Sequence, residues 1–583
     1  MKFSIISDAL QKMETTSKRL ELTDILVKLI QEIPEDVISR AVYLIQGKLR
    51  PNFEGVELGI AEKLVMKAMS KSSGIPLKNI EQDYNKGGDL GQTAENILQQ
   101  KIQTTFTSET ITLEKVYDTL YKIAKLEGKG SQEMKMRYVS SMLNDATPQE
   151  AKFILKILLG TLRLGIAENT VMDALAIAFT GKKENREVIE NAYNVSSDLG
   201  KVAEILSTEG IEQIKKFQIR LFSPIRPMLA DRIKSEEDTV KKFQEEFAAE
   251  YKLDGERAQI HKHKDTIEIF SRSLENITSY YPDIVEKISE KIITDNVILE
   301  AEVVAMNSNS GDFLPFQELM HRRRKYEIAD AVTKYPISVN FFDVLFSDGE
   351  NCMKMKYSER RKLLEKIIKQ DSFARLIPMS IINNEEQIIE VLENSINSGC
   401  EGLMLKHLDS IYRAGIRGSN WLKLKREYQN ELGDSLDLVV VGAFFGKGRR
   451  TGKYGTLLLS TYNDEEDTFP SICKVGTGFT DESLDQLYQI LSPKVTLKKN
   501  PRIVSEMEAD VWFEPELVIE IVASEITQSP IHKTALNKIK DGTGLALRFP
   551  KFTGKIRTEK NSEDASTGEE VIALYKVQKK TIT

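Results

Sequence analysis

One lysine, Lys252, stands in the strand-like segment EYKLDGER with a carboxylate two residues away on either side, at Glu250 and Asp254. Alternation along a strand predicts that Lys252 and Asp254 share one face. Gly255 then permits a sharp turn and the close approach of a ligand. A lysine becomes a nucleophile when burial or nearby positive charge lowers the pKa of its amine. Lys252 is therefore either an ordinary surface cation or a nucleophile, and the four residues KLDG alone favour the first.

Several positions further along the chain offer positive charge for such a site. Arg257 follows directly, and Arg272 ends a second strand-like run. Lys423 and Lys425 alternate in WLKLK, so both side chains are predicted on one strand face. Two lysines on one face repel each other unless an anion lies between them. We expect this pair to bind phosphate oxygens, and we expect the cations, with a bound metal, to lower the pKa of Lys252.

Carboxylates and aromatic residues extend the set. Glu300 and Glu302 alternate in LEAEVV, where they either hold Mg²⁺ or a ribose or lie on a solvated edge strand. The run EGLMLK offers a further carboxylate, Glu401, and a cation, Lys406. Phe341 and Phe342 lie together in NFFDVLF, where at least one is expected in the core and the other is free to stack on a base.

The elements that precede these residues are predicted to be helical up to about Phe222, because apolar residues recur with helical spacing. Two motifs in this region each occur twice and in the same order. LGIAE spans residues 58–62 and 164–168, and the pattern Y-N-x-x-x-D-L-G-x-x-A-E spans residues 84–95 and 193–204. This repetition indicates a duplicated helical unit with rough two-fold symmetry.

Glycines in the repeated motifs precede or open helical patterns. They are Gly59, Gly91, Gly165 and Gly200. A glycine at a helix start gives an anion access to free backbone N–H groups, so four such positions suit the two backbones of a duplex. The alternative is that these glycines only permit tight packing between helices.

Beyond the proline-containing segment 223–230 the pattern becomes mixed α/β, and beyond about Tyr428 it consists of short strands separated by turns. The predicted fold is therefore multidomain. An all-α domain spans residues 1–222 and an α+β domain residues 223–428. A small β-barrel, followed by a C-terminal helix, spans residues 429–583.

The composition is that of folded globular domains, because 41% of the 583 residues are hydrophobic and 29% are charged. No apolar run is long enough to cross a bilayer, and the three separated cysteines are typical of reduced thiols, so we expect a cytoplasmic protein with no membrane contact. The net charge of −7 argues against a uniformly basic nucleic-acid binder but permits local basic patches.

Taken in order, the motifs resemble the nucleotidyltransferase motifs of ATP-dependent DNA ligases. The matching stretches are Lys252-x-Asp-Gly, Phe-Ser-Arg272, Glu-x-Glu302, Phe342-Asp343, Glu401-Gly-Leu-Met and Trp-Leu-Lys423-Leu-Lys425. The helical region and the segment RFPKFTGKIRTEK, residues 548–560, are similar to the archaeal and eukaryotic replicative branch. The resemblance covers essentially the whole chain and implies an ATP-grasp-like ligase core and a C-terminal OB-fold.

The resemblance also implies ATP, with Mg²⁺ or another divalent cation, and a role for each matching residue. Lys252 would attack the α-phosphate and form lysyl-AMP. Glu250 and Phe342 would contact the adenine, Arg257 and Glu302 the ribose, and Arg272 the phosphate region. Glu302 and Glu401 would lie near the metal, and Arg417 and Lys423 would line the rest of the pocket with Lys425 close by. Arg548, Lys551 and Lys560 would orient the pyrophosphate. Lys551 and Glu559 stand where the family pattern has arginine and aspartate.

The implied substrate is nicked double-stranded DNA, contacted mainly through its backbone and sealed by a monomeric enzyme in replication, repair and recombination. The loop GKGRRTGKYG offers further phosphate contacts, unless it is simply a solvated loop; its cations are Lys447, Arg449, Arg450 and Lys453. Residues Gln99–Phe106, QQKIQTTF, resemble a peptide that docks on sliding clamps, with Thr105 in place of the first aromatic residue, or form an ordinary helix-to-loop segment.

Two other functions compete with this interpretation. A GTP-using RNA capping enzyme or an RNA ligase shares the lysine motif but generally lacks the duplicated helical domain. A non-catalytic DNA clamp or scaffold would retain the core without its chemistry, and the intact lysine, carboxylates and basic pairs argue against it.

Overall fold

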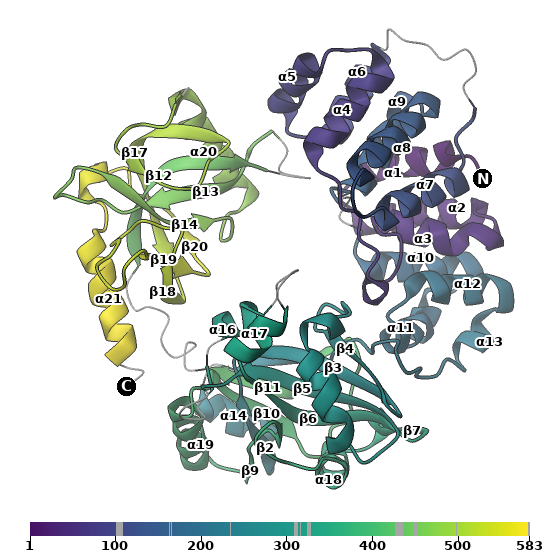
Figure 1. Ribbon diagram of the computed structural model, residues 1–583, viewed down its shortest axis with the longest axis vertical. Helices are drawn as coiled ribbons and strands as arrows, with labels where there is room; N and C mark the ends of the chain where they lie inside the picture. The colour runs from purple at the N-terminus through teal and green to yellow at the C-terminus, as the bar shows by residue number, and fades with distance from the viewer. Residues whose placement is uncertain are drawn as a thin grey trace. The chain divides into compact units, whose positions relative to one another are not determined.

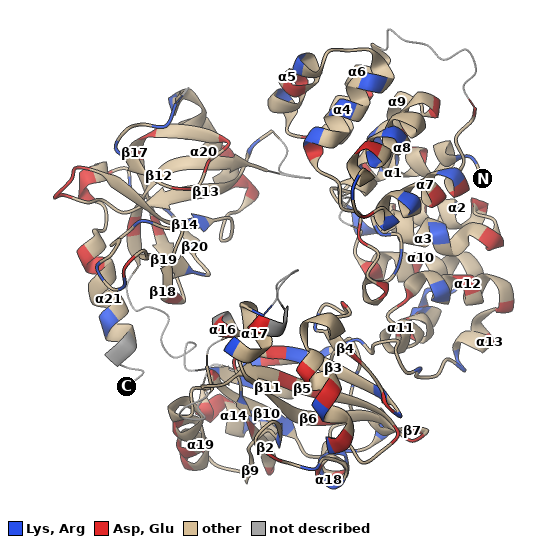
Figure 2. Cartoon of the chain, viewed as in Figure 1, with Lys and Arg blue, Asp and Glu red and all other residues tan. Residues whose placement is uncertain are grey.

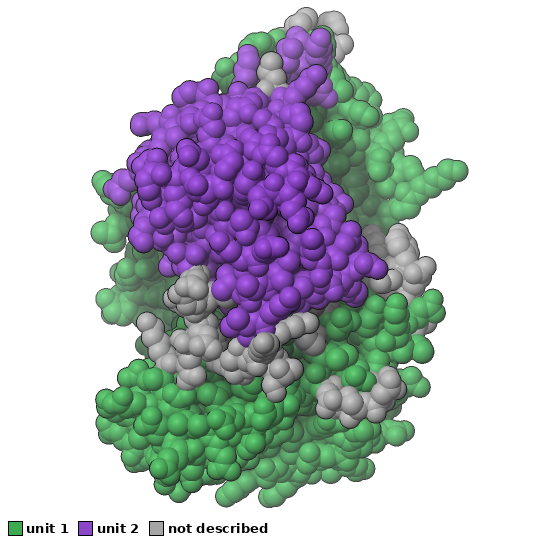
Figure 3. All heavy atoms as spheres, turned by 90° about the vertical axis from the view of Figure 1, so that its left-hand side faces the viewer, with its two compact units in different colours: residues 1–77, 94–426 green, residues 78–93, 427–583 purple. Residues whose placement is uncertain are grey.

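The structure is a computed structural model. It describes the whole chain except residues 101–108, 163, 165, 234, 308–312, 315, 323–327, 426–434, 447–451, 497 and 581–583. The chain divides into two compact units, one of residues 1–77 and 94–426 and the other of residues 78–93 and 427–583 (Figure 3). No helix within these described stretches is long and apolar enough to cross a membrane. Basic and acidic residues are interspersed on helices and strands alike (Figure 2).

The N-terminal region folds into helices, as its periodicity predicts (Figure 1). In α1, for example, Phe3, Ile6, Leu10 and Met13 form one buried face. The helices are α1 (Phe3–Glu14), α2 (Arg19–Glu32), α3 (Ile38–Ile45), α4 (Glu62–Ser73), α5 (Leu77–Gly87), α6 (Leu90–Gln99), α7 (Leu113–Lys125), α8 (Ser131–Asp145), α9 (Pro148–Leu158), α10 (Glu168–Thr180), α11 (Arg186–Ser196), α12 (Leu199–Glu209) and α13 (Ile211–Ile214).

The repeated motifs occupy equivalent places in the order of helices. LGIAE ends on the first residue of α4 and again on the first residue of α10, and the D-L-G triplet opens α6 and α12. A Cβ atom at Gly200 would lie 2.4 Å from the Tyr43 ring, so the packing explanation holds for this glycine. A Cβ atom at Gly59 would meet no atom within 4 Å, so the packing explanation does not hold for this glycine. Gly165 lies outside the described residues.

The central region is built on two β-sheets, as the mixed α/β pattern predicts (Figure 1). The strands are β1 (Leu229–Ile233), β2 (Phe247–Lys252), β3 (Glu256–His263), β4 (Thr266–Ser271), β5 (Asn296–Ala305), β6 (Ile337–Ser347), β7 (Glu350–Asn351), β8 (Ala374–Leu376), β9 (Met379–Ile382), β10 (Gly402–His407) and β11 (Arg417–Lys425). One sheet has the order β1-β11-β10-β2-β9, and the other has the order β4-β3-β5-β6-β7 with β8 beside β6.

Helices accompany both sheets of the central region. They are α14 (Glu236–Phe243), α15 (Pro282–Ile288), α16 (Phe316–Met320), α17 (Ile328–Lys334), α18 (Tyr357–Ile367) and α19 (Glu385–Asn397). Strand β5 lies between β3 and β6, so Glu300 and Glu302 are not on an edge strand. Phe341 is fully buried in the core of this sheet, which confirms that one of the two adjacent phenylalanines is a packing residue.

The chain passes from the first sheet to the second between Lys252 and Glu256. Strand β2 ends at Lys252, and Asp254 lies in the bend that follows, so the prediction that these two residues share a strand face is wrong. The physical reason is the crowding at Gly255, where a Cβ atom would lie 2.4 Å from the carbonyl oxygen of Val303. The chain must turn sharply there to start β3, and the turn ends the strand alternation.

The C-terminal region consists of short strands, as predicted. They are β12 (Leu436–Phe445), β13 (Tyr454–Ser460), β14 (Phe469–Val475), β15 (Val495–Thr496), β16 (Ile503–Val504), β17 (Val511–Val522), β18 (Glu525–Ser529), β19 (Gly544–Arg548) and β20 (Lys551–Ile556). The main sheet has the order β15-β17-β12-β13-β14-β16 with β20 beside β17, and β18 pairs with β19. Helix α20 (Asp481–Leu491) precedes β15, and the predicted final helix is α21 (Gly568–Lys580).

Candidate active site

A cavity of about 320 Å³ lies where the two sheets of the central region meet. It brings together the predicted site residues of that region, which come from positions far apart in the sequence. These are Glu250, Lys252, Arg257, Arg272, Glu302, Phe342, Glu401, Arg417, Lys423 and Lys425. The first sheet supplies the lysines and Glu250, and the second supplies Arg257, Glu302 and Phe342.

Strand register explains why Lys252 meets Glu401. Gly402 pairs with Lys252 on one side and with Lys425 on the other, so the residue just before β10 lies between two lysines. Gly402 has φ +148°, and a Cβ atom there would lie 2.2 Å from the carbonyl oxygen of Leu424, so only glycine fits this crossing. Glu401 accepts from the Lys252 ammonium, and its Oε2 lies 2.8 Å from Lys425 Nζ.

This ion pair shifts the pKa of Lys252 in the direction opposite to the one expected from the sequence. Burial lowers the pKa of the Lys252 amine, but Glu401 and Glu302 more than offset it, so the pKa is raised above the ordinary lysine value. The prediction that neighbouring cations lower this pKa is therefore wrong for the protein without ligands. The carboxylates lie closer to the amine than the sequence suggests, because strand register places Glu401 between the two lysines.

The surroundings shift the pKa values of the carboxylates in opposite directions. Burial raises the pKa of Glu401, but the ammonium groups of Lys252 and Lys425 outweigh it and hold the value at about 2. Burial raises the pKa of Glu302 to about 7, although Lys252 and Arg257 lower it. Burial and Glu401 also raise the pKa of Asp254, whose carboxylate accepts from the Phe316 amide at 3.1 Å. Of these carboxylates, Glu401 is therefore the one held most firmly in its charged form beside the Lys252 amine.

These carboxylates fit a magnesium ion that is shared with a substrate. Within the described residues, no group of three or more His, Cys, Asp or Glu side chains is arranged to hold a metal ion. Mg²⁺ commonly uses one or two protein carboxylates and completes its shell with water and substrate phosphates. Glu302 and Glu401 line the same cavity and meet this requirement.

A buried polar cluster lies on the side of the cavity that faces Phe342. Glu250 Oε2 lies 2.6 Å from Lys406 Nζ, and its other oxygen accepts from the Tyr357 hydroxyl. The Lys406 ammonium also lies 4.9 Å from the centre of the Phe342 ring and 4.3 Å from that of Trp421. The sequence offers Lys406 as a further cation, and the structure shows it buried in the strand GLMLKH as the partner of Glu250.

Arg257 is held by Glu300, which the sequence offered as a metal or ribose ligand, and by a backbone carbonyl group. Its Nε donates to Glu300 Oε2 at 2.6 Å, and its Nη1 donates to the Met228 carbonyl oxygen at 2.8 Å. Its guanidinium lies 5.3 Å from the centre of the Phe342 ring. Glu302 faces Arg257 in the strand register but is not its ion-pair partner.

Several cations also line the cavity. Burial, followed by repulsion from nearby cations such as Arg232 and Lys252, lowers the pKa of Lys423 to about 8. Arg272 and Arg417 are exposed, and Arg417 Nη1 donates to the Ala230 carbonyl oxygen at 3.2 Å. Such a set of cations suits the phosphates of a nucleotide.

The predicted residues beyond the central region belong to the second compact unit, where acidic side chains hold several of them. Arg548 Nη1 lies 3.4 Å from Glu525, and Lys560 Nζ lies 2.7 Å from Asp437. Lys551 is exposed at the start of β20. Lys453 forms an ion pair with Asp485, and the other cations of its loop lie outside the described residues. Residues 101–106 of the predicted clamp peptide also lie outside them.

Known families match the chain over most of its length. The model of the ATP dependent DNA ligase domain matches residues 227–425, that of the DNA ligase N terminus residues 2–176, and that of the ATP dependent DNA ligase C terminal region residues 450–560. The chain is 70% identical to a DNA ligase of Nitrosopumilus maritimus (strain SCM1) over 580 residues, which is 100% of this chain and 99% of the relative. The chain belongs to the ATP-dependent DNA ligases.

Other relatives agree with this assignment. The ligase is 46% identical to DNA ligase 2 of Thermofilum pendens (strain DSM 2475 / Hrk 5), over 99% of this chain and 98% of the relative. A solved structure named Pmar-Lig_Pre shares the fold, with a TM-score of 0.55 at 19% identity over 94% of this chain and 98% of that one. Nick sealing with ATP follows from membership of the family, and the resemblance inferred from the motifs is confirmed.

Proposed function

We propose that Lys252 is the nucleophile with which this ligase takes AMP from ATP. The Lys252 nitrogen attacks the α-phosphorus, a P–N bond forms, the bond between the α-phosphorus and the bridging oxygen breaks, and pyrophosphate leaves. The observation that carries the proposal is that Lys252 lies in one cavity both with Phe342 and Glu250, which suit a base, and with Arg272, Arg417, Lys423 and Lys425, which suit phosphates. This division matches the base and the phosphates of a nucleotide.

The roles of the remaining residues follow from their places in the cavity. Phe342 offers a ring face for adenine, and Glu250 lies on the same side. Arg257 and Glu302 lie opposite each other on the paired strands β3 and β5 and would bind the ribose. Lys423, with Arg417 and Lys425, lines the side suited to phosphates. Arg272 would bind the phosphate region, because it lies at the end of β4 with its side chain exposed.

The amine of Lys252 must lose its proton before it attacks. In the protein without ligands, Glu401 and Glu302 stabilise the protonated amine, because they raise its pKa. A bound divalent cation, with Mg²⁺ the expected one, would neutralise these carboxylates and the charge that develops on the phosphates. Glu302 and Glu401 are the residues that we propose hold it.

The later steps use the DNA. An oxygen of the 5′-phosphate attacks the AMP phosphorus, the P–N bond breaks, and Lys252 recovers its amine. The 3′-hydroxyl then attacks the activated 5′-phosphate, AMP leaves, and the strand is sealed. We propose that the helical repeat and the loop at residues 446–455 bind the backbone of the nicked duplex, because a nick occurs in any sequence.

We also propose the finer domain organisation. Domain boundaries at residues 222/223 and 428/429 are supported by the end of α13 at Ile214, the start of β1 at Leu229 and the family match of residues 227–425. The C-terminal strands would form an OB-fold barrel, from which Arg548, Lys551 and Lys560 would orient pyrophosphate.

Three further properties belong to this proposal. The ligase would act as a monomer in the cytoplasm, and residues Gln99–Phe106 would dock on a sliding clamp. Loss of clamp co-elution in a Phe106→Ala variant supports the docking, and unchanged co-elution contradicts it.

The decisive experiment compares the wild type with Lys252→Ala and Lys252→Arg. After incubation with ATP and Mg²⁺, intact-protein mass spectrometry is expected to show one added AMP on the wild type and none on either variant. Nick joining is expected to be lost in parallel. An unmodified Lys252 in protein that still joins nicked DNA with ATP contradicts the proposal.

A further inference from the structure

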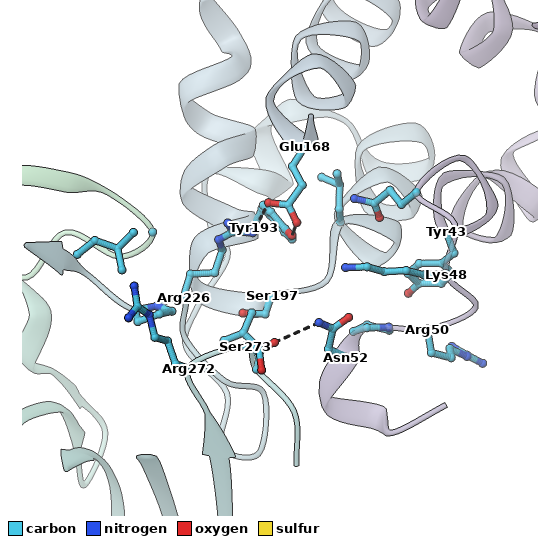
Figure 4. Close-up of a pocket in the computed structure, with 17 residues that line it drawn as sticks. Tyr43, Lys48, Arg50, Asn52, Glu168, Tyr193, Ser197, Arg226, Arg272 and Ser273 are labelled. Carbon is cyan, nitrogen blue, oxygen red and sulfur yellow. Dashed lines mark hydrogen bonds and ion pairs between the residues drawn. The ribbon is translucent and has the colours of Figure 1, made fainter. Parts of the chain in front are cut away.

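The cavity around Lys252 is called the nucleotide cavity below. A second cavity, of about 280 Å³, adjoins it within the same compact unit. The two cavities share Leu229 and Arg272 as lining residues. Several separate parts of the chain line the second cavity: residues 43–52 at and after the end of α3, residues 168 and 193–199 of the later helices, residues 226–229, the turn after β4, and Gly415. Helical and nucleotidyltransferase regions therefore meet around it (Figure 4).

The lining of this cavity carries an excess of positive charge. Its cations are Lys48, Arg50, Arg226 and Arg272, and Glu168 is its carboxylate. That carboxylate is fully engaged, because Oε1 accepts from the Tyr193 hydroxyl at 2.6 Å and Oε2 from Arg226 Nη1 at 2.6 Å. Glu168 is thus not available to neutralise the other cations.

Two of the cations have no partner within the part of the chain that the structure describes. Among the described residues, neither the Lys48 ammonium nor the Arg272 guanidinium makes a hydrogen bond or an ion pair. Figure 4 shows Lys48 reaching into the cavity from one side, with Arg226 and Arg272 on the other. Like charges that face a common space without a counterion are unfavourable, so the arrangement suits an anion between them.

The walls of the cavity are tied together, so its shape is defined. Asn52 Nδ2 donates to the Ser273 carbonyl oxygen at 3.1 Å, which joins the helical region to the turn after β4. The Arg226 amide donates to the Asn194 carbonyl oxygen at 2.8 Å, which joins the linker to α11. A Cβ atom at Gly415 would lie 2.3 Å from Asn194 Oδ1, so the two regions approach closely there as well.

We propose that this second cavity binds a phosphate of the nicked DNA strand between Lys48 and Arg272, so that the helical region supplies a positioning residue for AMP transfer. The inference rests on the proposed function of Lys252. Once Lys252 carries AMP, the next group to approach must be the 5′-phosphate. An anion site that shares Arg272 with the nucleotide cavity lies where the strand carrying that phosphate has to pass. Backbone phosphates are the anions this strand presents to the site.

The same chemistry would also suit the β- and γ-phosphates of ATP or free pyrophosphate, and kinetics separate the two sources. If the bound anion is a phosphate of DNA, replacing Lys48 slows AMP transfer and leaves the rate of lysyl-AMP formation unchanged. If the bound anion is a phosphate of ATP, replacing Lys48 slows lysyl-AMP formation, and that result would overturn the proposal.

The test uses full-length Lys48→Ala, first with ATP and then, as purified adenylated protein, with nicked duplex in a single turnover. We expect wild-type rates of lysyl-AMP formation and a roughly tenfold loss in AMP transfer at subsaturating DNA, as for one charge-assisted hydrogen bond. The slope of log affinity against log salt should fall by about one. Lys48→Arg should restore transfer because it keeps the charge. Lys28→Ala, an exposed lysine of α2 that lines neither cavity, is the matched control and should behave as wild type.

The outcomes distinguish this inference from the proposed function. If the wild type forms no lysyl-AMP, the proposed function itself fails. If Lys48→Ala forms lysyl-AMP and transfers it to DNA at the wild-type rate with an unchanged salt slope, the proposed function stands and this inference is wrong. A loss that Lys48→Arg does not restore, with an unchanged salt slope, points to packing in place of charge and also overturns it.

Discussion

Replacing Glu250 by glutamine tests how the base side of the nucleotide cavity is stabilised. Glu250 and Lys406 are each only 1% exposed, and Glu250 Oε2 lies 2.6 Å from Lys406 Nζ. Glutamine keeps the size of the side chain and an acceptor for the Tyr357 hydroxyl, but it removes the charge. The substitution therefore leaves the Lys406 cation buried without its anion.

The expected loss follows from this geometry. Removing one partner of a buried ion pair costs about 3–5 kcal/mol. The ring centres of Phe342, Tyr357 and Trp421 lie 4.9, 4.7 and 4.3 Å from Lys406 Nζ and remain in place to stabilise the cation. We therefore expect the lower end of the range, a loss of about 3 kcal/mol in the free energy of unfolding near neutral pH.

The loss should depend on pH. Burial lowers the pKa of Lys406 and Glu250 raises it in part, so the pKa falls further once Glu250 is neutral. Between that lower value and the ordinary lysine pKa of ~10.4, the unfolded chain binds a proton that the folded chain does not. The stability of the variant relative to the wild type therefore rises with pH, and the loss is larger at about pH 6 than at about pH 9.

Urea unfolding followed by the fluorescence of Trp421 is the assay. The chain has two tryptophans, so a Trp512→Phe background leaves Trp421 as the reporter, and it lies beside Lys406. In Glu250→Gln/Lys406→Met both charges are absent, and at least half of the lost stability should return. A loss below ~0.5 kcal/mol at about pH 6, or a double variant no more stable than the single one, would refute the reasoning.

Other changes test other parts of the site. Gly255→Ala should cost about 3 kcal/mol, because its Cβ meets a backbone oxygen of β5 at 2.4 Å, whereas Gly418→Ala, which meets nothing within 4 Å, should be neutral in the same melting assay. For ATP, kcat/KM should stop rising above about pH 8 as Lys423 loses its proton, while in Lys423→Arg it should continue to rise as Lys252, whose pKa is raised, loses its own; identical profiles would contradict this. Chelation by EDTA should stop lysyl-AMP formation without changing the Tm, since Glu302 and Glu401 form no complete metal site within the described residues; a lower Tm would show a structural metal.

Local sequence was sufficient for the residue types and for the elements that carry them. The periodic runs gave the helices before Phe222 and the strands from β3 to β6, because hydrophobic spacing reports which face an element buries. The position of Lys252 beside a glycine and the order of the motifs that follow were enough to indicate a nucleotidyltransferase of the ligase family. These features need no knowledge of distant contacts.

Tertiary structure decided which of these residues touch. Glu401 sits between Lys252 and Lys425 because Gly402 pairs with both lysines across three adjacent strands, and that register reverses the expected shift in the Lys252 pKa. Lys48 and Arg272 face one cavity although 224 positions separate them in the chain. Spacing along a chain reports local periodicity, whereas pKa values and unpaired charges depend on burial and on partners that only the packing of distant elements supplies.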